Sequence, residues 1–124
     1  MRGFRRPLRR LSPRPQYDLL QFHFHSPSEH AFDERRTEME AHLVHRRRGS
    51  KNDLAVLGVM LSAGSNLKKN RALSAALNSA PFLVNTKVEC QVDPADLLPP
   101  GGVNKTEIIT YQGSLTTPPC RCAL

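Results

Sequence analysis

Residues 17–25 constrain the fold more than any other stretch, because their apolar and polar side chains alternate. Leu20, Phe22 and Phe24 fall on one face, and Gln21, His23 and His25 fall on the other. This period of two predicts a β-strand, on which the two histidines leave the same face about 7 Å apart. On a helix the same spacing would separate them by about 200°. The chain is therefore expected to present neighbouring imidazoles on one face of a sheet.

The rest of the pattern predicts a mostly β fold of the α+β kind, with one or two short helices. A surface turn at residues 33–36 leads to a second alternating strand over residues 39–45, whose polar face carries Glu40 and His42. Leu54–Leu61 is almost entirely apolar and is expected to be a strand buried on both faces. Residues 46–53 are expected to connect these two strands as a hairpin. Further strands are predicted over residues 87–92 and 106–111.

One helix is predicted over residues 67–79, with Asn66 as its N-cap and Pro81 just beyond its end. The residues expected to face inward are Leu67, Leu73, Ala76 and Leu77. Residues 94–102 are rich in proline and glycine and are expected to form a loop. At 124 residues, the chain has room for one domain at most.

The positive charge is concentrated at the N-terminus. The chain carries 18 Lys and Arg against 11 Asp and Glu, and six of the arginines lie in residues 1–16, which contain no acidic residue. We interpret residues 1–16 as a solvated, disordered leader and expect no specific nucleic-acid partner, although clustered arginines are also what a phosphate contact needs. No apolar run is long enough for a membrane span, and no apolar stretch follows the leader to make a signal peptide.

Three of the five histidines share a chemical logic. The second strand brings His42 to the face of His23 and His25, so that three imidazole nitrogens converge and leave a fourth tetrahedral position open, as in catalytic zinc sites. Gln21 and Glu40 each precede a ligand candidate by two residues and are placed to accept hydrogen bonds from the non-ligating ring nitrogens.

Other interpretations of these residues remain. A His-x-His pair alone is a weak signal for metal, and a lone histidine such as His30 or His45 is usually a satisfied core residue. Cysteine ligation is the rival arrangement, but Cys120 and Cys122 are too close in sequence for a zinc knuckle.

Several blocks together resemble the α-class carbonic anhydrases, most closely the bacterial members. These are Gln-Phe-His-Phe-His at 21–25, Ser-Glu-His at 28–30, Glu-Ala-His-Leu-Val-His at 40–45 and Gly-Ser-Leu-Thr-Thr-Pro-Pro at 113–119, with Leu-Ala-Val-Leu-Gly at 54–58 and Asp-Pro-Ala-Asp-Leu-Leu at 93–98 between them. The likeness runs from Tyr17 to Cys120. It implies the central part of a large, twisted, mainly antiparallel sheet.

The resemblance implies a zinc-dependent lyase that hydrates CO₂ reversibly to bicarbonate through zinc-bound hydroxide. By that resemblance His23, His25 and His42 bind Zn²⁺, while Thr116 accepts a hydrogen bond from the hydroxide and donates its own proton to Glu29. The substrate pocket is expected to be lined by Val44, Val56, Leu115 and Thr117.

The chain also departs from the family pattern. Family members are considerably longer, and the part that carries the proton-shuttle histidine has no counterpart here. We therefore expect residues 17–124 to be a partial domain, truncated at both ends, whose turnover is impaired. The alternative is a catalytically silent zinc-binding or structural remnant. Cys120 is expected to be unpaired or to pair with Cys90. Related bacterial enzymes are exported, but these residues specify neither a compartment nor an oligomeric state.

Overall fold

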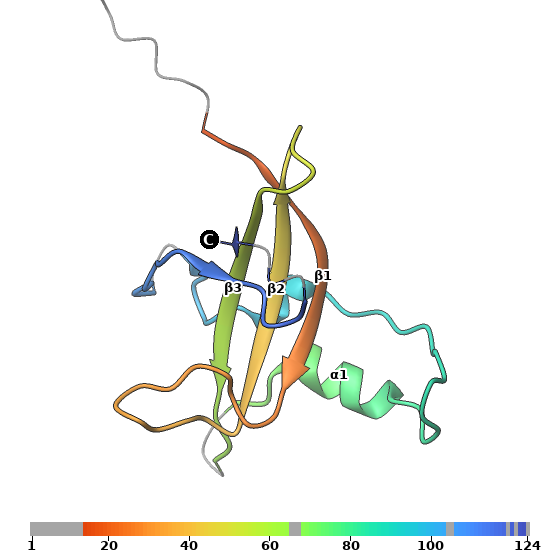
Figure 1. Cartoon of the computed structure of the whole chain (residues 1–124). Coiled ribbons are helices and arrows are strands. Elements are labelled where there is room, and N and C mark those ends of the chain that lie inside the picture. The colour runs from red at the N-terminus through yellow and green to blue at the C-terminus, as the bar shows by residue number, and fades with distance from the viewer. Residues whose placement is uncertain (1–13, 65–67, 104–105, 119, 121, 124) are drawn as a thin grey trace, which may run out of the picture.

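The computed structural model describes residues 14–64, 68–103, 106–118, 120 and 122–123. Three long strands form its centre: β1 (Tyr17–His25), β2 (Met39–Arg47) and β3 (Leu54–Leu61). They are followed by helix α1 (Arg71–Ser79), the 3₁₀ helix η1 (Pro94–Leu97), and the short strands β4 (Gly113–Ser114) and β5 (Cys122–Ala123), as Figure 1 shows. The expected mostly β fold with one α-helix is confirmed.

The strands form one sheet in the order β1-β2-β3-β5-β4. β1 pairs antiparallel with β2, and β2 pairs antiparallel with β3, while β5 joins the far edge of β3 in parallel. The register of β1 shifts between Leu19 and Gln21, where one extra residue forms an irregularity. From Gln21 onward the pairing is continuous, and this part of the ladder carries the histidines.

The two hairpin connections contain residues in the left-handed backbone region. Asp33 and Glu34 have φ values of 49° and 63°, and the flanking Phe32 and Arg35 exchange backbone hydrogen bonds. Asp tolerates this region better than most residues because its short side chain bonds locally. Gly49, with φ of 79°, serves the tighter turn between β2 and β3. The surface turn predicted at residues 33–36 is confirmed.

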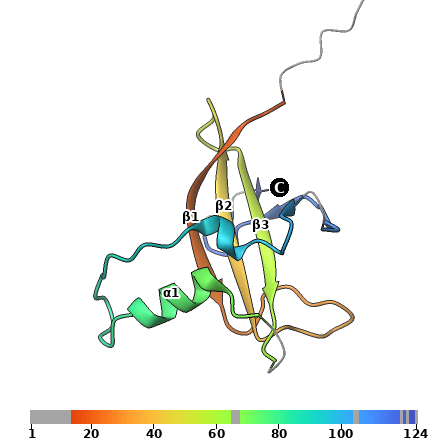
Figure 2. The same ribbon diagram turned by 180° about the vertical axis from the view of Figure 1, so that it is seen from behind.

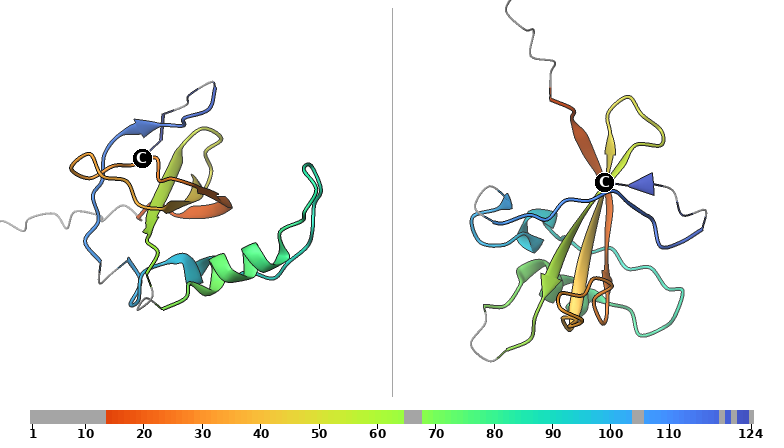
Figure 3. Two further views of the ribbon diagram at one scale, coloured as in Figure 1. Left: turned by 90° about the horizontal axis from the view of Figure 1, so that it is seen from below. Right: turned by 60° about the vertical axis from the view of Figure 1, so that its left-hand side comes forward.

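One face of the sheet carries the hydrophobic core. Its buried residues are Ala41, Leu43, Val59, Ala72 and Leu97, with Phe22, Phe24, Leu57, Leu61, Val92 and Leu98 packed against them. Helix α1 and η1 cover this face, whereas the C-terminal segment crosses the opposite face (Figures 2 and 3). The sheet therefore has an apolar side that stabilises it and a second side that is free to hold polar groups.

The start of the helix differs from the prediction. Helix α1 begins at Arg71, and its N-cap is Asn70, whose side chain accepts a hydrogen bond from the Leu73 amide and donates one to the Asp96 carbonyl. The second bond ties the helix start to η1, a long-range contact that a local pattern does not reveal. Asn66 and Leu67, the predicted cap and first inward residue, lie outside the described residues.

The prediction of which helix residues face the core was also partly wrong. Ala72 is the buried residue of α1, Leu73 and Ala76 are half-buried, and Leu77 is 60% exposed. Because α1 contacts the rest of the molecule mainly near its N-terminal turns, its last turn extends beyond the sheet (Figure 2). Pro81 follows the end of the helix as expected.

Two predicted strands are absent, and β3 is less buried than predicted. Residues 87–92 and 106–111 run without strand structure, because a strand needs a hydrogen-bonding neighbour and none accompanies these segments in the described part of the chain. In β3, Val59 is buried while Gly58 is exposed, so the expectation of burial on both faces is wrong. The face opposite the core is only partly covered.

Two further observations concern the cysteines and membrane insertion. Cys90 and Cys120 are exposed free thiols, so they do not pair with each other. None of the helices in the described ranges has the length and apolar character needed to cross a membrane.

Candidate metal centre

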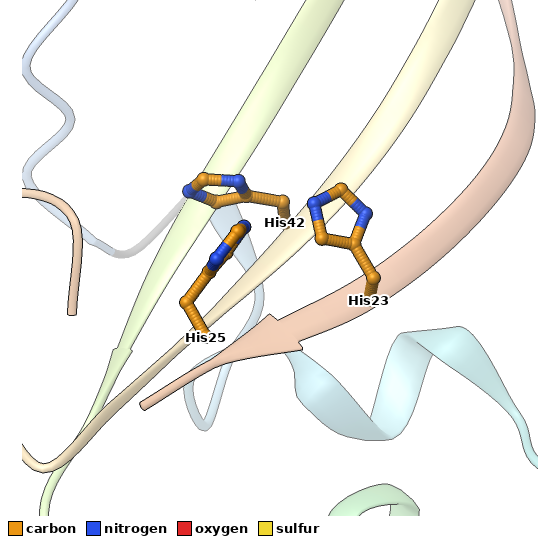
Figure 4. Close-up of side chains that lie close together, drawn as sticks. All are labelled: His23, His25 and His42. Carbon is orange, nitrogen blue, oxygen red and sulfur yellow. The ribbon is translucent and has the colours of Figure 1, made fainter. Parts of the chain in front are cut away.

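Three imidazole rings converge on the face of the sheet opposite the core. His23 of β1 lies directly opposite His42 of β2, and His25 lies opposite Glu40 two residues further along the ladder, on the same face. The ring centroids are 4.9 Å apart for His23 and His25, 5.3 Å for His23 and His42, and 4.7 Å for His25 and His42. Figure 4 shows the three rings turned toward a common point. The predicted convergence of the three histidines is confirmed.

Each of the three rings has one nitrogen that is available to bind a metal ion. In His23 and His42 the other nitrogen is hydrogen-bonded to a neighbouring side chain. Gln21 Oε1 lies 2.9 Å from His23 Nδ1, and Glu40 Oε1 lies 2.8 Å from His42 Nε2, so His23 Nε2 and His42 Nδ1 keep free lone pairs. In His25 the available atom is Nε2, which is buried and has no hydrogen-bond partner among the described residues. A buried polar atom without a partner is costly, and a metal ion supplies what it lacks.

These residues fit a zinc ion. Zinc–nitrogen bonds of about 2.0–2.1 Å in a tetrahedral site place ligand nitrogens about 3.4 Å apart. One ligand nitrogen from each of the three histidines lies within 4.8 Å of the other two. Small side-chain rotations would bring these nitrogens to the shorter separation of a tetrahedral zinc site. Imidazole is a preferred zinc ligand, and three protein ligands leave the fourth position open to a small molecule.

The electrostatics of His23 also favour metal binding. Burial is the largest cause that lowers the pKa of His23, and the neighbouring His42 and His25 lower it further. A histidine binds a metal through the lone pair of its neutral form, so a lowered pKa keeps the ring in the form that a metal needs.

Glu40 is the buried carboxylate behind the three rings. It is fully buried, and its two oxygens accept four hydrogen bonds: from the Glu29 amide at 2.9 Å, the His30 amide at 3.0 Å, the His30 ring at 2.6 Å and the His42 ring at 2.8 Å. Burial alone would raise the pKa of Glu40, but these hydrogen bonds from His30 and His42 outweigh it and lower the pKa. Glu40 is therefore an ionised carboxylate that only accepts hydrogen bonds.

The predicted Glu29 and Thr116 pair is brought together by the C-terminal segment. Thr116, just after β4, donates a hydrogen bond of 3.4 Å to Glu29 Oε1, across 87 positions of sequence. Glu29 also lies 3.6 Å from His25 Nδ1, which places the pair beside the three rings. Thr116 itself is exposed.

The predicted pocket residues are placed unevenly. Val44 and Val56 pair across β2 and β3, two residues along the ladder from the pair of His42 and Gly58, with Val44 7% exposed and Val56 half-buried. Leu115 is half-buried and Thr117 is exposed on either side of Thr116. The roles of these four residues in a substrate pocket stay predictions.

Sequence reasoning missed three residues around Glu40. His30, interpreted as a satisfied core histidine, does bond through both ring nitrogens, to Glu40 and to Tyr111, but it is half-buried rather than in the core. Gly58 lies so close that a Cβ there would stand 2.8 Å from Glu40 Oε1. The Ser-Glu-His block at 28–30 could have indicated that His30 belongs to the site. Tyr111 lies 81 positions from His30 in the sequence, and no local pattern connects the two residues. His45, by contrast, bonds the Leu43 carbonyl as a satisfied histidine should.

A second group of potential ligands, His30, Glu40 and His42, also lies within 4.8 Å. Here the carboxylate oxygen already accepts hydrogen bonds from both rings, so a metal would have to break two bonds and expel two ring protons. The group of His23, His25 and His42 requires no such loss and is the better candidate.

Comparisons with known proteins identify the family of this chain. The family model for eukaryotic-type carbonic anhydrase matches residues 6–123. A carbonic anhydrase from Nostoc sp. is 40% identical over 108 residues, which cover 85% of this chain and 38% of that protein. The structure of a Chlamydomonas reinhardtii carbonic anhydrase in complex with acetazolamide is 50% identical, with a TM-score of 0.72, and the match covers 86% of this chain and 45% of that one. The structure of a Thermovibrio ammonificans α-carbonic anhydrase in complex with sulfanilamide is 35% identical, with a TM-score of 0.72. The match covers 87% of this chain and 45% of that one.

The chain thus spans less than half the length of these relatives. They come from bacteria and an alga alike, so the narrower likeness to bacterial members stays a prediction, as does the boundary after residue 16. The family model nevertheless covers nearly the whole chain, and identities of 35–50% accompany a shared fold. This chain belongs to the eukaryotic-type, or α, carbonic anhydrase family.

Proposed function

We propose that this chain binds one zinc ion through His23, His25 and His42 and hydrates CO₂ reversibly to bicarbonate. The observation that carries the proposal is the set of three converging rings, each with a nitrogen left available, which includes the unpartnered Nε2 of His25. The proposed reaction is that of the carbonic anhydrase family, and three histidine nitrogens are ligands suited to the zinc ion that the reaction requires.

A zinc ion held there acts as a Lewis acid that makes water a nucleophile near neutral pH, an effect for which carbonic anhydrases are the familiar example. Gln21 and Glu40 accept hydrogen bonds from the opposite nitrogens of two ligands, which orients the rings and raises their basicity. Both residues thus serve the metal without touching it.

Thr116 has the role of orienting the nucleophile. Because its hydroxyl donates to the Glu29 carboxylate, its own lone pairs are free to accept a hydrogen bond from an incoming O–H group. A ligand without such a proton would meet lone pairs rather than a donor. This pair therefore selects for water and against anions that carry no hydrogen.

CO₂ is nonpolar, and an apolar wall beside the metal holds it without competing polar contacts. Val44 and Val56 lie on the face of the histidines, two residues along the ladder from His42, and offer such a wall. Leu115 and Thr117 would complete it from the C-terminal segment.

The test is CO₂ hydration by stopped flow on the zinc-loaded full chain, compared with His25→Ala and with His45→Ala as the matched control. His45 lies on β2 and bonds the chain's own backbone, so its loss should leave hydration unchanged. The proposal predicts hydration by the wild type and by the control, no hydration by His25→Ala, and inhibition by acetazolamide. Equal rates for the wild type and His25→Ala would contradict it.

A silent zinc-binding protein is the second candidate, and the exposure of Thr116 and Thr117 favours it, because an open pocket excludes water poorly. Zinc bound at the three histidines without measurable hydration would select this candidate.

A further inference from the structure

One end of the sheet gathers exposed cationic side chains. It is the end where β1 begins and where the turn between β2 and β3 lies, because Tyr17 pairs with Arg47 (Figure 1). We call its exposed cations the basic end, and they are Arg14, Arg46, Arg47, Arg48 and Lys51.

Two carboxylates compensate part of this charge. Asp53 Oδ2 lies 3.2 Å from Arg47 Nη1. Asp18 Oδ1 lies 2.7 Å from Arg48 Nη2. The other three cations of the basic end form no ion pair with any residue that the structure describes. The basic end therefore keeps a positive charge that its own neighbours do not neutralise.

The arginine-rich start of the chain is attached to the same end. The Arg48 amide donates a hydrogen bond to the Gln16 carbonyl at 2.8 Å, and the Arg48 guanidinium donates one to Gln16 Oε1 at 2.8 Å. These bonds hold residue 16 beside the turn. Residues 1–13 lie outside the described residues, but they contain five more arginines and no acidic residue, and they join the chain here.

The opposite end of the sheet has no such excess of positive charge. The turn between β1 and β2 carries two exposed arginines among three exposed acidic residues, namely Arg35, Arg36, Asp33, Glu34 and Glu38. Positive charge is thus concentrated at one end of the sheet, and a charge distribution of this kind orients a protein on an anionic surface.

Apolar side chains lie beside these cations. Leu19 pairs with His45, the residue that precedes Arg46 on β2. Leu20 falls at the irregularity of β1 and has no partner in the register with β2. The side chains of Leu19 and Leu20 are 38% and 45% exposed. Because an irregularity of this kind turns a side chain away from the regular ladder, the basic end presents leucines together with charges.

We propose that the basic end, with Leu19 and Leu20, binds the surface of a membrane that contains anionic lipids. The negative potential of such a surface strengthens binding about fivefold for each nearby Lys or Arg. Exposed leucines add to this by entering the boundary between headgroups and acyl chains. The proposal goes beyond the proposed function and does not depend on zinc, because Arg46 is four residues from His42 along β2, about 13 Å.

The leucines favour a membrane over a nucleic acid. Clustered cations also attract a nucleic acid, but exposed leucines gain nothing from its phosphate backbone. Proteins that bind unpaired bases stack them on exposed aromatic rings. Tyr17 is the one aromatic residue in residues 14–20 and 46–54, and it is half-buried.

The first test is cosedimentation of the full chain with lipid vesicles. One set contains phosphatidylcholine alone, and the other contains equal parts of phosphatidylcholine and phosphatidylserine. Binding should require phosphatidylserine and should weaken as salt rises from about 0.1 M to 1 M, because salt screens charges. Equal binding to both sets, or binding to neither, would overturn the proposal.

The second test removes charge from either end of the sheet. Arg46→Ala combined with Lys51→Ala should weaken binding to the phosphatidylserine vesicles about 25-fold, at about fivefold for each charge. Arg35→Ala combined with Arg36→Ala removes the same charge from the opposite end and should leave the affinity nearly unchanged. An equal loss in the two double variants, or no loss in the first, would show that the basic end is not the binding surface.

The third test separates a membrane from a nucleic acid. Leu20→Ser should weaken vesicle binding about fivefold, as expected when a leucine is partly buried on binding. Leu83→Ser, which changes an exposed leucine in the segment after α1, is the control and should have no effect. If the wild type binds duplex DNA more tightly than vesicles, and Leu20→Ser leaves vesicle binding unchanged, the basic end is a nucleic-acid surface and the proposal is overturned.

Discussion

His23 and His42 face each other directly across the β1–β2 ladder, with ring centroids 5.3 Å apart. Because side chains alternate between faces, a slip of one residue in this register would send His23 to the opposite, apolar face. The candidate metal centre is therefore a property of the hairpin register. The same register places Gln21, Glu40 and Gly58 around the rings.

Gly58 is the residue whose replacement should disturb the site most specifically. A Cβ at this position would stand 2.8 Å from Glu40 Oε1, an atom that four hydrogen bonds to its carboxylate prevent from moving freely. Gly58→Ala is expected to weaken zinc binding about 10- to 100-fold, measured by competition with a chelator of known affinity.

The control for this prediction is Gly49→Ala. Gly49 has φ of 79° and open space around it, so the substitution should destabilise the fold by about 1 kcal/mol without touching Glu40. Unchanged zinc affinity in Gly49→Ala together with weakened affinity in Gly58→Ala would separate the two effects. Normal zinc affinity in Gly58→Ala would mean that the position of the Glu40 carboxylate does not determine how tightly the site binds zinc.

Thr116→Val removes a hydroxyl and keeps the shape of the side chain. Zinc stoichiometry should stay the same, while kcat/KM for CO₂ hydration should fall about 10- to 100-fold, because the hydrogen bond to Glu29 is lost. Thr110→Val, an exposed position on the same segment, is the control and should leave both quantities unchanged. Full activity in Thr116→Val would remove the residue from the mechanism.

The apolar face should be essential for stability. Leu97 in η1 is 1% exposed and packs in the core cluster, so Leu97→Ala should lower the free energy of unfolding by about 2–5 kcal/mol. Leu83, which is 74% exposed, should give a change within about 0.5 kcal/mol when replaced by alanine. Urea unfolding of both variants measures this, and similar midpoints would show that η1 does not cover the sheet in solution.

The ion pair between Asp18 and Arg48, at the start of β1 and just after β2, should make a pH-dependent contribution to the stability of the fold. The hydrogen bond from Arg48 to Asp18, at 2.8 Å, is the main cause that lowers the pKa of Asp18 below its ordinary value. A lowered carboxyl pKa stabilises the fold above about pH 4, the ordinary value for Asp, and the effect is lost as pH falls through the lowered pKa. Asp18→Asn should therefore be less stable than the wild type at pH 7.

That difference should shrink below about pH 4, as followed by urea unfolding across the pH range. Asp33→Asn, in the exposed turn between β1 and β2, removes the same charge without removing this bond and is the matched control. A difference between Asp18→Asn and wild type that is constant with pH would show that the ion pair is not formed.

The sequence predicted the features that short-range patterns determine. The bounds of β1 and β3 agree with their alternating and apolar patterns, and strand geometry was enough to bring His23, His25 and His42 together. The supports Gln21 and Glu40 followed from the same period of two. These residues lie within one hairpin, so their contacts are nearly local.

The features that depended on distant partners were missed. The segments at 87–92 and 106–111 have strand-like composition, but no neighbouring strand pairs with them in the described part of the chain. Helix α1 begins at Arg71 with Asn70 as its N-cap, where the sequence had predicted Asn66, and the Asn70 side chain also bonds the Asp96 carbonyl. Tyr111 reaches His30 across 81 positions, a contact that only the folded chain defines.

Zinc stoichiometry on the purified full chain tests the central claim most directly. The account predicts about one zinc per chain for the wild type and for His45→Ala, and almost none for His42→Ala, measured by elemental analysis after dialysis. Substitution by cobalt(II) should give a tetrahedral spectrum without a thiolate band, which excludes Cys90 and Cys120 as ligands. Zinc that binds equally to His42→Ala, or a wild type that binds none, would contradict the assignment of the three histidines.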